Sequence, residues 1–157
     1  MSQERFEELI ASVTERIAGR PLGQSLQGEL NRQFPADGET FESLAALCRE
    51  GIREGWLCGR ERGGIKFGRI LQADPGTHRF SVDVVEMGDI VGPHHRHPNG
   101  EIDMIIPQTE GAEFDGHGKG WLVYAPGSAH SPTVTQGRAI VLYLLPEGAI
   151  EFSPPAS

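Results

Sequence analysis

The first part of the chain repeats its apolar residues at the spacing of an amphipathic helix. This spacing places them along one face, and the turn GRPLG that follows predicts the end of the helix. The apolar face consists of Phe6, Leu9, Ile10, Val13 and Ile17.

Two further helices are predicted before residue 56. The second begins at the candidate cap Ser25 and stops at Pro35, and Thr40 can cap a third helix that ends at Gly55. Their apolar positions are Leu26, Leu30 and Phe34, then Phe41, Leu44, Leu47, Cys48 and Ile52. Such stripes indicate core packing or a subunit contact rather than a cofactor site.

From Trp56 onward the apolar period changes to two, which is typical of short β-strands. The candidate strands are IKFGRIL, FSVDVVEM, EIDMII, GWLVYA, TVT and AIVLYLL. Turn signals such as ERGG, ADPG, HPNG and TQG separate them. Strands at this spacing favour a barrel or jelly-roll over alternating βαβ units. We therefore expect a mainly β fold, in which a helical segment, residues 1–55, packs on a barrel of residues 56–157.

Composition narrows the possible partners. The 157 residues carry a formal net charge of −8, which argues against nucleic acid and anionic membrane surfaces. The two cysteines lack CxxC spacing and do not indicate a disulfide framework. The amphipathic start lacks a signal-peptide core, and no apolar stretch is long enough to cross a bilayer. We expect a reducing cytoplasmic setting.

Histidines are concentrated in one part of the chain, because five of the six lie between positions 94 and 130. Residues two apart in a strand share a face, so His95 and His97 point the same way, opposite to His94. The turn PNG can bring Glu101 back toward this pair, and His130 follows a proline–glycine turn. A bulge in GPHH would invert the alternation, which leaves His94 as an alternative to His95.

Three imidazoles and one carboxylate suit a divalent transition metal. The set leaves coordination positions open, as catalytic metal sites do. Nitrogen and oxygen donors favour Fe, Mn or Ni, and Zn is not excluded. His78 and His117 lie outside the cluster and are expected to be solvated.

Two stretches resemble the metal-binding motifs of the cupin superfamily. GDIVGPHHRHPNGE is similar to the first motif and GWLVYAPGSAH to the second. The resemblance implies that His95, His97, Glu101 and His130 are the metal ligands. The leading glycine stands one residue further from the H-x-H than usual, so the register of the first motif keeps His94 open. In the second motif the glycine and histidine lie one residue closer to the proline, and Val134 replaces the trailing asparagine.

A closer resemblance covers most of the chain. HRHPNGEID together with YLLPEGAIEF is similar to the para-hydroxylaminobenzoate lyase family, a small group of cupins. The resemblance implies conversion of 4-hydroxylaminobenzoate, a small aromatic acid, to protocatechuate and ammonia in bacterial nitroaromatic degradation. It also favours a homodimer. The alternatives are another metal-dependent cupin enzyme, such as a dioxygenase or isomerase, and a non-catalytic ligand-binding cupin.

Such a reaction needs a proton donor for the leaving group and a base for the ring proton. Asp103 shares a strand face with Glu101 and could be the base, or could fix a histidine tautomer. Tyr124 is a second candidate for proton transfer.

The substrate carboxylate requires a cation. Arg69 alternates with Ile65 and Phe67, so its guanidinium would point into the barrel, and Arg96 and Arg79 are alternatives. Phe67 and Trp121, with Phe80 and Tyr143, could form an apolar slot for the ring, or plain core.

Overall fold

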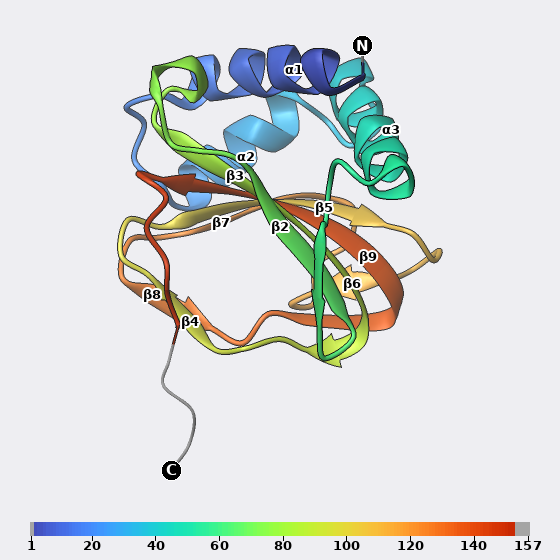
Figure 1. Cartoon of the computed structure of the whole chain (residues 1–157). Coiled ribbons are helices and arrows are strands. Elements are labelled where there is room, and N and C mark those ends of the chain that lie inside the picture. The colour runs from blue at the N-terminus through green and yellow to red at the C-terminus, as the bar shows by residue number, and fades with distance from the viewer. Residues whose placement is uncertain (1, 153–157) are drawn as a thin grey trace.

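The computed structural model describes residues 2–152. Three helices lie over one face of a large, curved sheet, and a small sheet forms the opposite wall (Figure 1). The helices are α1 (Ser2–Ile17), α2 (Gln24–Gln33) and α3 (Glu39–Glu54). In the order of the chain, the first eight strands are β1 (Arg60–Arg62), β2 (Ile65–Leu71), β3 (Phe80–Val91), β4 (His95–His97), β5 (Glu101–Pro107), β6 (Glu113–Phe114), β7 (Gly120–Tyr124) and β8 (Ser128–His130). They are followed by β9 (Thr133–Pro146) and β10 (Glu151–Phe152), and a 3-10 turn, Pro75–Thr77, precedes β3.

All neighbouring strands are antiparallel. The large sheet has the order β1-β2-β3-β9-β5-β7, with β6 also paired to β9, and the small sheet has the order β10-β4-β8. This arrangement confirms the mainly β, cupin-type jelly-roll fold with helices at its N-terminal end.

The helix boundaries differ slightly from the expected ones. Ser25 and Thr40 are not caps but the second residues of α2 and α3, which begin after Gly23 and Gly38. Glycine is an accepted residue at this position. Gly55 does end α3, in the left-handed conformation at φ 90°.

The expected turn TQG does not interrupt the last long strand. TVT and AIVLYLL belong to one strand, β9, because Gln136 and Gly137 form a bulge with φ values of 66° and 128°. The register with β3 shifts opposite this point, between Gly88 and Ile90. A β-bulge accommodates residues with turn-like backbone conformations while the strand continues on either side.

The large sheet is buried on both faces, which separates the core into two clusters. Alternate residues of β5, such as Ile102 and Met104, pack with the helices, whereas Ile105 packs inside the barrel. The apolar faces of the helices belong to the outer cluster, which confirms core packing. Cys48 and Cys58 are free thiols, as expected. Within residues 2–152, no helix combines the length and apolarity that a membrane crossing requires.

Candidate metal centre

Four side chains from three strands converge between the two sheets. His95 and His97 lie on β4, Glu101 begins β5, and His130 ends β8 directly opposite His95. One ligand atom from each lies within 4.8 Å of the others. The structure thus brings together the four residues that the sequence motifs indicate, and His94 is exposed outside this group.

Two glycine turns place these residues. The carbonyl of His97 accepts hydrogen bonds from Gly100 N at 3.2 Å and from Gly127 N at 2.7 Å. Gly100 has φ 90°, and a Cβ added there would lie 2.8 Å from the carbonyl oxygen of Tyr124. Only glycine fits this turn without displacing backbone, and the turn returns Glu101 toward the histidines.

Each imidazole is held through its Nδ1 atom by a different group. Nδ1 of His95 lies 3.2 Å from Pro93 O, and Nδ1 of His97 lies 2.9 Å from Ser128 Oγ. Nδ1 of His130 lies 2.5 Å from Asp115 Oδ2. Partners of this kind fix the ring orientation and leave Nε2 available as a metal ligand.

The three Nε2 atoms surround the Glu101 carboxylate. Its oxygens lie 3.3, 3.2 and 3.4 Å from Nε2 of His95, His97 and His130, respectively. Nevertheless, His97 Nε2 and Glu101 Oε2 are buried without a hydrogen bond of acceptable geometry. Buried polar atoms without hydrogen bonds are uncommon and call for an explanation. A divalent metal ion bound by these four side chains would satisfy both atoms, so the donor set fits one.

The Glu101 carboxylate and the His130 imidazole of the site shift each other's pKa toward the ionised forms. Burial opposes ionisation of Glu101, but the three imidazoles outweigh it and hold the pKa of this carboxyl well below its usual range. Burial also disfavours a charged His130, yet its hydrogen bonds with Asp115 and Glu101 raise the pKa of the imidazole to about 9. The Glu101 carboxylate is therefore held in its ionised form among the imidazoles, which is the form that a metal ion requires of this ligand.

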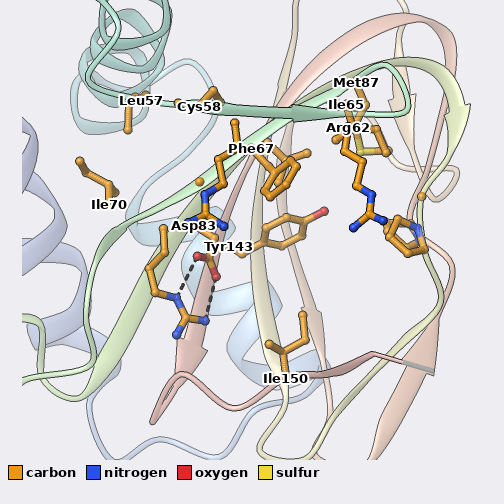
Figure 2. Close-up of a pocket in the computed structure, with 18 of the residues that line it drawn as sticks. Leu57, Cys58, Arg62, Ile65, Phe67, Ile70, Asp83, Met87, Tyr143 and Ile150 are labelled. Atoms are coloured by element: carbon orange, nitrogen blue, oxygen red, sulfur yellow. Dashed lines mark hydrogen bonds and ion pairs between the residues drawn. The ribbon is translucent and has the colours of Figure 1, made fainter. Parts of the chain in front are cut away.

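A cavity of about 1270 Å³ leads to this centre and has His95 in its wall. Apolar side chains from β2, β3 and β9 line much of it, among them Phe67, Met87 and Tyr143 (Figure 2). The Tyr143 ring lies across the cavity with its hydroxyl directed inward. A planar aromatic ligand fits such walls.

Comparison with known proteins agrees with this geometry. The family model for 4-hydroxylaminobenzoate lyase matches residues 8–152. The chain belongs to the 4-hydroxylaminobenzoate lyase family. It is therefore an enzyme of the lyase class.

Two curated relatives carry the name 4-hydroxylaminobenzoate lyase. The protein from Nocardioides sp. (strain LMS-CY) is 35% identical over 151 residues, covering 89% of each chain. The protein from Pseudomonas putida is 32% identical over 154 residues, covering 87% of this chain and 88% of that one. A solved RmlC-like cupin from Ralstonia eutropha is similar at a TM-score of 0.44 and 11% identity, over 59% of this chain and 62% of that one.

Asp103 and Tyr124, the expected proton-transfer residues of this lyase-family chain, do not line the cavity. Asp103 is fully buried beside Glu101, and burial followed by the charge of Glu101 raises the pKa of its carboxyl well above the usual range. Such a group keeps its proton, which does not suit the expected base. The Tyr124 hydroxyl donates to Asp115 Oδ2 at 2.5 Å.

Arg69 lines the cavity, but its guanidinium is already bound to a carboxylate. Its Nε and Nη2 atoms donate to Asp83 at 2.9 and 3.2 Å (Figure 2, dashed lines). The alternatives Arg96 and Arg79 pair with Glu151 and Glu147. Neither of these alternatives lines the cavity.

Trp121 lies on the opposite face of the large sheet from the cavity. Its ring packs at 5.9 Å from that of Phe41, and its Nε1 donates to Phe34 O at 2.9 Å. The register explains this placement, because Trp121 is opposite Met104, which faces the helices. The structure therefore does not bring Trp121 to the ring slot expected from the sequence, whereas Phe67 does line the cavity.

Sequence reasoning missed several residues of the site. Asp115 stands in FDGHGKG, which reads as a turn, and its φ of 50° suits aspartate in a loop. The short strand β1 was also missed, because its last residues overlap the sequence ERGG, which was interpreted as a turn. His78 is not simply solvated, since its Nδ1 lies 2.9 Å from Thr14 Oγ1 on α1.

Proposed function

We propose that this protein converts 4-hydroxylaminobenzoate to protocatechuate and ammonia with a divalent transition metal at His95, His97, Glu101 and His130. The observation that carries the proposal is the convergence of three Nε2 atoms on one carboxylate at the wall of an aromatic-lined cavity. The names of the two relatives support the substrate.

The overall conversion balances with one water and no external oxidant. The N–O and C–N bonds break and the nitrogen leaves as ammonia, while the ring gains two hydroxyl groups, one in place of the nitrogen and one in place of the hydrogen on the adjacent carbon. Reduction at nitrogen offsets oxidation at the ring. A bound Fe, Mn, Ni or Zn ion would supply a Lewis acid for this chemistry.

The side chains of the cavity orient the substrate. Phe67 and Met87 supply apolar surface for the ring and exclude bulk water. The Tyr143 hydroxyl is directed into the same space and can donate a hydrogen bond to the bound substrate (Figure 2).

Asp103, Tyr124 and Asp115 act through the ligands rather than on the substrate. Asp115 fixes the His130 tautomer, with Nδ1 donating and Nε2 directed to the metal, and Tyr124 donates to the same carboxylate. Asp103 is buried next to Glu101, where it can act through that ligand but not on the substrate.

The proposal is tested with purified protein loaded with one metal at a time. Metal content is measured first, and the protein is then incubated with 4-hydroxylaminobenzoate while protocatechuate and ammonia are quantified. We expect both products in equal amounts. His95→Ala should lose metal and activity, whereas His117→Ala, which removes an exposed histidine outside the cluster, should lose neither.

Two results would overturn the proposal. Metal-replete protein that leaves the substrate unchanged would remove the lyase activity. Full metal content and activity in His95→Ala would remove the ligand assignment.

A further inference from the structure

We propose that Arg62 on β1 binds the carboxylate of the aromatic substrate and sets the preference of the cavity for benzoates over neutral analogues. This inference rests on the proposed function and adds to it the residue that recognises the acid group.

The pairing of β1 with β2 places its arginines on the inner face. Arg60 is opposite Phe67 and Arg62 is opposite Ile65, and all four residues line the cavity. Glu61 is opposite Lys66, and neither of these two lines it. The alternation of the strand thus directs the cationic residues of β1 inward and its one acidic residue away.

The charge balance of the cavity is opposite to that of the chain. Its lining carries three arginines against one carboxylate, Asp83, whereas the whole chain has a formal net charge of −8. Arg69 and Asp83 neutralise each other. The remaining two positive charges belong to Arg60 and Arg62, and a cavity with this balance favours an anion.

Two of these arginines are available to a ligand, because within residues 2–152 neither the Arg60 nor the Arg62 guanidinium makes an ion pair or hydrogen bond. Of the two, Arg62 points its guanidinium into the cavity (Figure 2). Arg69 would have to release Asp83, which would leave a largely buried carboxylate unpaired, a costly exchange. A free guanidinium can instead donate two parallel hydrogen bonds to the two oxygens of a carboxylate.

The neighbours of Arg62 define the rest of the ligand. Ile65, Phe67, Met87 and Ile150 contribute apolar walls around the Tyr143 ring (Figure 2). A flat ring with one carboxylate matches apolar walls combined with an unpaired guanidinium. The class of ligand is therefore an aromatic monocarboxylate.

The test compares two unreactive probes, 4-hydroxybenzoate and 4-hydroxybenzamide, which differ at one group, a charged carboxylate in the first and a neutral amide in the second. Their dissociation constants are measured by calorimetry for the metal-loaded protein and for Arg62→Met, which keeps the apolar stem. Lys66→Met is the matched control, because it removes one positive charge from the other face of the neighbouring strand.

We expect the native protein to prefer the benzoate. Arg62→Met should weaken benzoate binding about 10- to 100-fold and leave amide binding unchanged, because only the charge-assisted hydrogen bonds are lost. Lys66→Met should bind both probes as the native protein does. With 4-hydroxylaminobenzoate, Arg62→Met should raise KM and leave kcat nearly unchanged.

An undiminished preference for the benzoate in Arg62→Met overturns the inference, as does a loss that occurs in Arg60→Met instead. Arg62→Lys, which retains the charge, repeats the comparison if the first variant does not fold, and it should retain part of the preference.

The role of Arg62 and the lyase reaction can be rejected independently of each other. Turnover with no effect of Arg62→Met rejects only the role of Arg62. A benzoate preference that depends on Arg62, without protocatechuate formation, rejects only the lyase reaction.

Discussion

At the scale of single residues, the candidate metal centre depends on the groups that hydrogen-bond to its three histidines. Backbone carbonyl, hydroxyl and carboxylate acceptors hold the Nδ1 atoms of His95, His97 and His130, respectively. The carboxylate, Asp115, is the strongest of these acceptors, and it also accepts from Tyr124 and from the backbone of Thr133. Such partners set ligand orientation and basicity.

Asp115→Asn should lower metal affinity roughly 10- to 100-fold, because an amide is a weaker acceptor and can present the wrong group to His130. The affinity is measured by competition with a chelator. Glu113→Gln is the control, since it neutralises a carboxylate two residues from Asp115 that is not among the four candidate ligands and makes no hydrogen bond or ion pair within residues 2–152. Equal affinity in Asp115→Asn and native protein would show that Asp115 does not position His130.

At the scale of elements, the large sheet has two different faces. The outer face packs against the helices, as Trp121 of β7 does against Phe41 of α3, and the inner face lines the cavity. Sequence alternation identifies which residues share a face, but it does not say which face is the outer one. This explains why Phe67 reaches the cavity and Trp121 does not.

Trp121→Phe should lower the free energy of unfolding by about 1–3 kcal/mol, because the partly buried Phe34 carbonyl loses its hydrogen bond. Stability is measured by urea unfolding, and steady-state kinetics with 4-hydroxylaminobenzoate should show an unchanged KM. Phe67→Leu, on the inner face, should show the converse pattern, with a raised KM. A raised KM in Trp121→Phe would contradict the placement of Trp121 outside the substrate site.

At the scale of the whole molecule, the candidate ligands link the two sheets. Glu101 belongs to the large sheet, whereas His95, His97 and His130 belong to the small one. An ion bound by all four side chains ties these walls together in the native state only. Binding of this kind stabilises the folded protein by mass action. The homodimer stays a prediction from the family resemblance.

Metal at 100 times its dissociation constant should stabilise the protein by about 2.7 kcal/mol. For a chain of this size that raises Tm by roughly 5–10 °C. Differential scanning calorimetry of chelator-treated and metal-loaded protein measures the shift, and His95→Ala should show little of it. Identical transitions with and without metal would contradict a site that spans both sheets.

The sequence by itself determined much of the fold and the composition of the metal cluster. Helical and strand periods are local properties, so the three helices and most strands could be predicted from them. The H-x-H spacing and the PNG turn are equally local, and they predicted that His95, His97 and Glu101 would lie together. His130 was predicted from the proline–glycine turn before it and from its resemblance to the second motif, because local periodicity alone does not reveal a long-range contact.

Only the tertiary structure decided which partners each side chain has. The pairing of β4 with β8 excluded His94, and the packing of the helices on one sheet face removed Trp121 from the cavity. The Asp83 carboxylate occupies Arg69, and the edge strand β1 directs Arg62 inward. Contacts between residues distant in sequence follow from strand order and register, which local periodicity does not encode.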